Sequence, residues 1–155
     1  MRKQSGFSLI ELLIVVAIIL IIAAIAIPNL LRARIASNES SAVASIRTIN
    51  TAMVSYNSAY PSVGFAANLT PLSGNCTSIA PTSDSACLID TALAGGTKSG
   101  YSFNAQGTSS GYAAWANPQH VNTTGVRAFC SVADAVIRTN TAGISTCVGS
   151  ETPLQ

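Results

Sequence analysis

Residues 7–31 read FSLIELLIVVAIILIIAAIAIPNLL, and this stretch decides the fold class. Sixteen consecutive apolar residues run from Leu12 to Ile27, and Glu11 is the only charged residue between positions 7 and 31. As a helix, these 25 residues extend about 37 Å, which exceeds the roughly 30 Å of a hydrocarbon core. The sequence therefore predicts a helix whose surface is covered by lipid or by other subunits.

The charge content of the chain fits a membrane-associated protein better than a nucleic-acid-binding one. Charged residues make up 9% of the 155 residues, against about 25% in ordinary soluble domains, and the net charge is +2. Arg2 and Lys3 precede the apolar run and Arg32 and Arg34 follow it, a distribution typical of membrane interfaces. Because basic residues form no larger cluster, we expect no direct nucleic-acid binding.

The four cysteines, Cys76, Cys87, Cys130 and Cys147, all follow the apolar segment. They form no C-x-x-C pair, and His120 is the only histidine, so the short ligand spacing of a zinc site is missing. We expect two disulfides, an oxidising compartment, and no metal or cofactor. Three pairings are possible, and loop closure favours the sequential one, Cys76–Cys87 with Cys130–Cys147.

A second, amphipathic half of the same helix is predicted for residues 32–60. Its apolar positions are separated by 7, 4, 3, 4, 3 and 4 residues, which places them on one helical face; they are Ile35, Ala42, Ile46, Ile49, Met53, Tyr56 and Tyr60. Glycine is absent from Phe7 through Tyr60, so we expect one helix of about 80 Å ending near Ala59, before Pro61. Pro28 lacks a backbone donor and predicts a kink or loosening near residues 24–28.

The remainder of the chain predicts a small antiparallel sheet packed on this helix. Proline and glycine punctuate residues 61–100, which we interpret as a connecting region. Residues 101–155 are expected to form the sheet and a C-terminal tail, and the predicted strands are Tyr101–Asn104, Tyr112–Asn117, Val126–Val132 and Ala135–Thr139. The predicted fold class is therefore α+β, with a hairpin turn at Ala133-Asp134.

Residues 1–6 are short and basic and read as a leader peptide. An ordinary signal peptide would place the small-residue cleavage position after the apolar run, whereas Gly6 stands before it. If the chain is cut after Gly6, the new α-amino group of Phe7 lies one helical turn from Glu11.

Glu11 is the unusual residue of the apolar run, because a carboxylate at membrane depth is costly and points to a function. Two interpretations of it stay open. Glu11 either reaches the headgroups and gains from the helix dipole, or it pairs with a buried cation and fixes the packing register between neighbouring subunits.

The segment formed by Gly6, Phe7, Glu11 and the apolar helix through Pro28 closely resembles the class III signal of type IV prepilins, of the type IVa kind. The resemblance implies that a prepilin peptidase cleaves between Gly6 and Phe7 and N-methylates Phe7. It implies that Glu11 pairs with the N-terminus of an adjacent subunit and that the helix can melt near Pro28 in filaments. A disulfide joining strand to tail is common in these pilins.

The resemblance implies a structural subunit of a type IV pilus, used for adhesion, twitching motility or DNA uptake. Residues 7–31 would hold it in the inner membrane, and assembly machinery would polymerise it with identical or related subunits into an extracellular filament. Two alternatives stay open: a pseudopilin of a type II secretion system, and a monomeric membrane-anchored binding domain. No enzymatic activity is expected, because His120 stands alone and the aspartates Asp84, Asp90 and Asp134 show no paired spacing.

Overall fold

The computed structural model describes residues 8–74 and 80–154. The chain divides into two compact units, residues 1–34 and 35–155. Helix α1 (Leu9–Ala59) begins in the first unit and ends in the second, so its two halves are described separately. Its helical assignment continues through Pro28. The predicted loosening near residues 24–28 does not interrupt the helix, because proline removes only one backbone donor from it.

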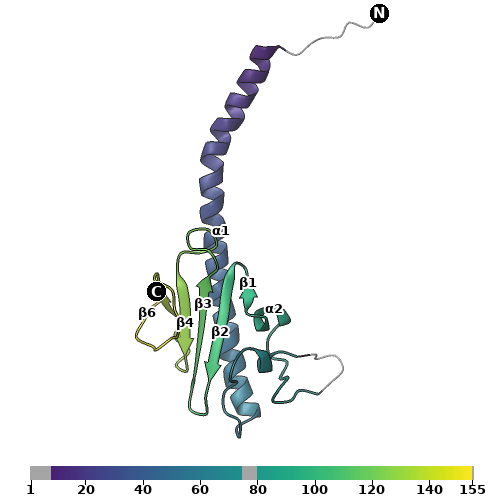
Figure 1. The fold of residues 1–155 in the computed structure, drawn as a ribbon, viewed down its shortest axis with the longest axis vertical. Helices are drawn as coiled ribbons and strands as arrows, with labels where there is room; N and C mark the ends of the chain where they lie inside the picture. The colour runs from purple at the N-terminus through teal and green to yellow at the C-terminus, as the bar shows by residue number, and fades with distance from the viewer. Residues whose placement is uncertain (1–7, 75–79, 155) are drawn as a thin grey trace, which may run out of the picture. The chain divides into compact units, whose positions relative to one another are not determined.

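The second unit is an antiparallel sheet packed against the second half of α1 (Figure 1). Its strands follow one another in sequence order and are β1 (Thr97–Lys98), β2 (Tyr101–Gly107), β3 (Tyr112–Pro118), β4 (Ala128–Val132), β5 (Arg138–Asn140) and β6 (Thr152–Pro153). Each strand pairs antiparallel with the next. The α+β prediction is confirmed.

The predicted connecting region, residues 61–100, contains secondary structure that the sequence pattern did not indicate. A short 3₁₀ helix η1 (Thr70–Leu72), helix α2 (Thr91–Ala94) and strand β1 lie within it. Asp90 caps α2, because its carboxylate accepts a hydrogen bond from the backbone N–H of Leu93 at 2.7 Å.

Two predicted strands begin later than their composition indicated. The strand predicted from Ala135 begins at Arg138, because Ala135 has a φ of 58° and Val136 N–H donates to Asp134. The strand predicted from Val126 begins at Ala128, because the preceding backbone N–H groups bind a carboxylate on α1 instead of a neighbouring strand. Strands β1 and β6, of two residues each, were not predicted.

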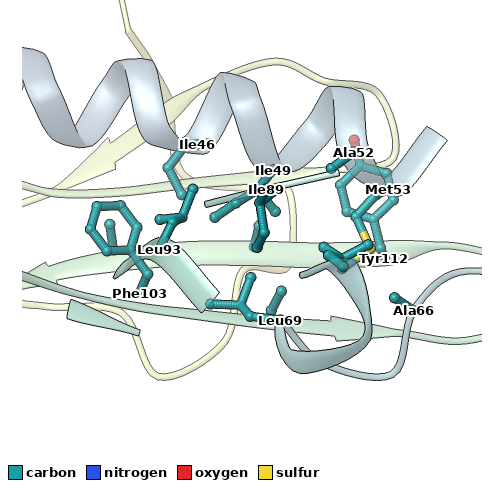
Figure 2. Packing of buried hydrophobic residues seen from close by; sticks show 14 of the residues in the cluster. Ile46, Ile49, Ala52, Met53, Ala66, Leu69, Ile89, Leu93, Phe103 and Tyr112 are labelled. Atoms are coloured by element: carbon teal, nitrogen blue, oxygen red, sulfur yellow. The ribbon is translucent and has the colours of Figure 1, made fainter. Parts of the chain in front are cut away.

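The core lies between α1 and one face of the sheet (Figure 2). Side chains alternate along β2 and β3, so that Tyr101, Phe103 and Ala105 and their neighbours Tyr112, Ala114 and Ala116 are all buried. The predicted helical stripe supplies the other side of the core, since Ala42, Ile46, Ile49, Met53 and Tyr56 are buried. Full burial of each large apolar side chain contributes about 1.5–3 kcal/mol.

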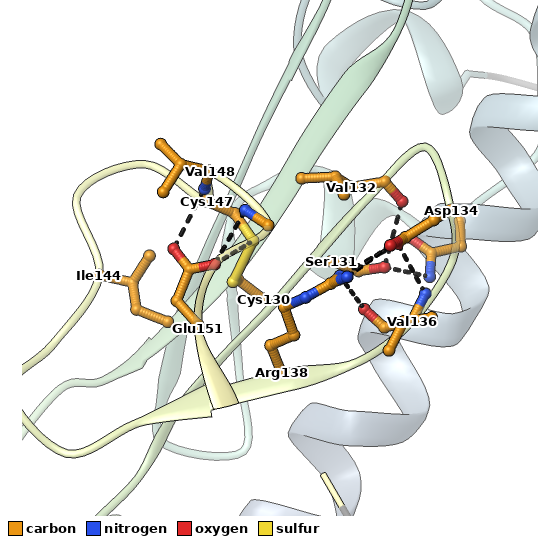
Figure 3. Close-up of a disulfide and its surroundings, with 12 residues drawn as sticks. Cys130, Ser131, Val132, Asp134, Val136, Arg138, Ile144, Cys147, Val148 and Glu151 are labelled. Atoms are coloured by element: carbon orange, nitrogen blue, oxygen red, sulfur yellow. Dashed lines mark hydrogen bonds and ion pairs between the residues drawn. A yellow bond between two sulfur atoms is a disulfide. The ribbon is translucent and has the colours of Figure 1, made fainter. Parts of the chain in front are cut away.

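The opposite face of the sheet is covered by the C-terminal tail (Figure 3). Cys130 on β4 and Cys147 in the tail form a disulfide with a Cα–Cα distance of 5.7 Å, and Ile144 packs beside it. Closing a loop of this length stabilises a fold by about 3 kcal/mol. The predicted Cys130–Cys147 pairing is confirmed. Cys76 lies outside the described residues, so its pairing with Cys87 stays a prediction.

Candidate assembly helix and its anchor in the head

The first half of α1 presents apolar side chains on every side. Sixteen large apolar residues between Leu9 and Leu31 have exposed fractions of 41–77%. An exposed apolar surface of this extent marks a site of contact with lipid or protein. Within residues 8–74 and 80–154, α1 is also the one helix long and apolar enough to cross a membrane.

Glu11 interrupts this surface in the first turn of α1. The carbonyl of Ser8 accepts a hydrogen bond from Leu12 N–H at 3.2 Å, which starts the helical hydrogen-bonding pattern just ahead of Glu11. A carboxylate in the first turn gains from the helix dipole. Glu11 is exposed and has no ion-pair partner in the part of the chain that the structure describes. Gly6 and Phe7 lie outside that part, so the predicted cleavage and the predicted pairing with Phe7 stay predictions.

Glu39 lies on α1 near the start of the second unit and connects the helix to the loop that precedes β4. Its Oε1 accepts hydrogen bonds from the backbone N–H groups of Val126 and Arg127 at 3.0 and 3.1 Å. Its Oε2 accepts two more from Nε and Nη2 of the Arg127 guanidinium at 2.9 and 2.7 Å. Glu39 is only 8% exposed, so a single buried carboxylate is satisfied by four donors.

Hydrogen bonding overcomes burial at this carboxylate. Burial alone raises the pKa of Glu39, but the hydrogen bonds from Val126 N–H and from the Arg127 side chain and N–H lower it further than burial raises it. The pKa of Glu39 therefore lies below its ordinary value, and the group stays charged in the folded protein at neutral pH.

The sequence analysis did not identify Glu39 as a buried residue, although the spacing of the apolar positions along the helix indicated it. The predicted stripe leaves a gap of seven residues between Ile35 and Ala42, and Glu39 fills it at the regular spacing of four and three. A charged residue on the buried face of a helix requires a cationic partner. The sequence does not show that this partner is Arg127.

The loop beside this anchor contains His120, whose backbone is held by Thr124. Asn38 Nδ2 donates to the carbonyl of Thr124 at 2.9 Å, and Thr124 Oγ1 bonds the backbone N–H and carbonyl of His120. The His120 residue itself is exposed. These contacts hold the loop against α1.

The family described as "Prokaryotic N-terminal methylation motif" matches residues 1–27, the segment that contains Gly6, Phe7 and Glu11. The chain is also 62% identical over 40 residues to the type IV wide pilus major component PilA4 of Thermus thermophilus. It is 48% identical over 54 residues to the type IV major pilin protein PilA of Myxococcus xanthus. In this N-terminal part the chain is similar to type IV pilins. The resemblance predicted from the sequence is confirmed.

A third protein similar to this chain belongs to a secretion system. The chain is 41% identical over 64 residues to the type II secretion system core protein G of Vibrio cholerae. The three matches cover 26%, 35% and 39% of this chain, and 30%, 24% and 44% of the respective relatives. The chain therefore spans less than half the length of each of these relatives. No solved structure matches it.

Proposed function

We propose that this chain is the structural subunit of a type IV pilus filament. A prepilin peptidase cleaves it between Gly6 and Phe7 and N-methylates Phe7. Residues 7–31 hold the subunit in the inner membrane, and assembly machinery then polymerises it through the same apolar helix into an extracellular filament. The observation that carries this proposal is the exposed apolar surface from Leu9 to Leu31, in a chain whose residues 1–27 match the N-terminal methylation motif.

Glu11 favours a polymer over a plain membrane anchor. An anchor in lipid has no need of a carboxylate, which costs several kcal/mol at membrane depth. In a filament, the same carboxylate finds the α-amino group of Phe7 on a neighbouring subunit. If two subunits pack at any other axial offset, the carboxylate is buried without a partner, which is unfavourable. The ion pair therefore selects one axial offset between subunits.

Pro28 suits a helix that is continuous in the subunit and loosens on packing. The helix already lacks the hydrogen bond that an N–H at position 28 would donate. The turn before Pro28 has one backbone hydrogen bond fewer than the other turns, so it loosens most easily when neighbouring subunits pack against this region. We assign the filament core to residues 7–31 and the contact with the sheet to residues 32–60.

A second candidate function is a pseudopilin of a type II secretion system. The likeness to core protein G of Vibrio cholerae favours it. Both functions use the same N-terminal motif and apolar helix, so the location of the filament separates them. A pilus extends from the cell surface, whereas a pseudopilus is confined beneath the outer membrane.

The test is to shear filaments from the surface of cells that express the chain and to sequence the N-terminus of the subunit by mass spectrometry. We expect the subunit to begin at N-methylated Phe7. A processed subunit that never reaches the sheared fraction favours the pseudopilin. An unprocessed chain that begins at Met1, dispersed as a membrane monomer, contradicts both and leaves a membrane-anchored binding domain.

A further inference from the structure

Most charged side chains of the second unit already have partners. Ion pairs join Lys98 to Asp90, Arg127 to Glu39 and Arg138 to Asp134. Glu151 accepts hydrogen bonds from the backbone N–H groups of Val148 and Gly149. Among the described residues of this second unit, called the head below, Asp84 is the one carboxylate with neither an ion pair nor a hydrogen bond, and Arg47 is the one guanidinium without an ion pair.

Arg47 lies at a hollow on one side of the head. The hollow has a volume of about 440 Å³, and α1 supplies Glu39, Val43 and Arg47 to its wall. The lining also includes Arg127 from the loop before β4, Phe129 from β4 and Leu154 from the C-terminal segment. Because Arg127 already neutralises Glu39, the charge of Arg47 is the uncompensated one, and the hollow suits an anionic partner.

Asp84 lies at the tip of a fixed turn. Thr82 and Ser85 exchange backbone hydrogen bonds at 3.1 Å in both directions, which closes the turn around Ser83 and Asp84. The buried Tyr56 donates its hydroxyl to the carbonyl of Ser83 at 2.7 Å and so fastens the turn to α1. Asp84 is exposed and makes no hydrogen bond or ion pair among the described residues. The turn therefore presents a carboxylate in a fixed position.

The turn and the hollow lie on different sides of the head. Arg47 and Tyr56 are nine residues apart on α1, about two and a half helical turns, so they point in opposite directions. The turn also leads into α2, which contacts β1 at one edge of the sheet, whereas Leu154 follows β6 at the other edge (Figure 1). Arg47 and Asp84 of one subunit therefore cannot satisfy each other.

We propose that the hollow at Arg47 receives the Asp84 turn of a second copy of this chain and forms an ion pair between subunits. This inference rests on the proposed filament function and names a contact within it. Two complementary patches at different places on one subunit give a head-to-tail contact, which extends into an open helical array when the rotation between subunits does not close a ring. Each subunit offers both patches, so the same contact repeats along the filament.

A charge-exchange experiment tests the pair in cells that assemble the wild-type filament. Arg47→Glu and Asp84→Arg are each expected to reduce sheared filaments several-fold, while the amount of subunit in the membrane stays unchanged. The double variant Arg47→Glu with Asp84→Arg restores the pair in the reversed sense, and filament yield returns toward the wild-type level. Gln106→Glu, at an exposed position of β2 outside both patches, is the matched control and leaves the yield unchanged.

The outcomes separate this proposal from the proposed function. Wild-type filaments that persist in both single variants overturn the ion pair and leave the filament function standing. Single variants that fail without rescue by the double variant also overturn the pair. Absence of surface filaments from wild-type cells overturns the filament function and, with it, the contact.

Discussion

Glu39 and Arg127 are separated by 88 residues in the chain, yet both bonded nitrogens of the Arg127 guanidinium lie within 2.9 Å of Oε2 of Glu39. The backbone N–H of Arg127 binds the other oxygen of the same carboxylate. The carboxylate side chain is 10% exposed and the arginine side chain 45%. This contact fixes α1 to the sheet four residues after the second unit begins at Ile35.

Glu39→Gln is expected to destabilise the folded protein by about 1–3 kcal/mol. The amide keeps one oxygen for the backbone N–H groups, but its NH₂ group faces a guanidinium that can only donate. Urea unfolding of the full chain in detergent, followed by circular dichroism, measures the difference. Asp84→Asn is the matched control, since that carboxylate has no partner among the described residues, and its effect is expected to stay within about 0.5 kcal/mol. Equal effects of the two substitutions contradict a stabilising role for Glu39.

The same carboxylate predicts a pH dependence of stability. The pKa of Glu39 is lowered below 4.5 in the folded protein, so the unfolded chain binds more protons over this range. The stabilisation is complete above the ordinary pKa and is lost as pH falls through the lowered one. The urea concentration at the unfolding midpoint, measured between about pH 3 and pH 7, should decrease as the pH is lowered. The decrease should be less steep in Glu39→Gln than in the wild-type protein. Some slope remains in the variant, because the pKa values of Asp90, Asp134 and Glu151 are lowered as well. An unchanged slope contradicts the assignment to Glu39.

Features of the fold that are set by neighbouring residues could be predicted from the sequence, whereas features that are set by contacts between distant residues could not. The length of α1 and its buried stripe follow from the spacing of neighbouring residues, so both could be predicted from the sequence. Glu11 could be predicted as a functional residue because it contrasts with its immediate surroundings. The start of β4 could not be predicted from neighbouring residues. Glu39, which is 87 residues from Val126 in the sequence, binds the backbone N–H groups of Val126 and Arg127, so these groups do not pair with a strand. The two-residue strands β1 and β6 exist only because a neighbouring strand pairs with them.

Gly125→Ala is expected to destabilise the head through Tyr101. A Cβ at position 125 would lie 2.0 Å from the Tyr101 hydroxyl oxygen. That hydroxyl donates to the carbonyl of Arg127 at 2.7 Å, and Tyr101 is fully buried, so it has no room to move. Overpacking of this kind costs about 1–3 kcal/mol. Gly111→Ala is the control, because the nearest atom to its added Cβ is 3.8 Å away. Urea unfolding of both variants measures the difference in stability. Equal unfolding midpoints contradict a clash between the added Cβ of Gly125→Ala and Tyr101.

Glu11→Ala is expected to leave membrane insertion intact and to abolish or strongly reduce filament assembly. Removing the carboxylate makes the apolar run easier to insert. It also removes the partner that we assign to the Phe7 amino group, and leaving one member of a buried pair alone costs about 3–5 kcal/mol. Immunoblots of the membrane fraction and of the sheared fraction measure the two steps separately, and Glu11→Asp, which keeps the charge on a shorter side chain, is expected to be intermediate. Unchanged filaments would refute the register role, since a carboxylate that only reaches the headgroups has no reason to act on assembly.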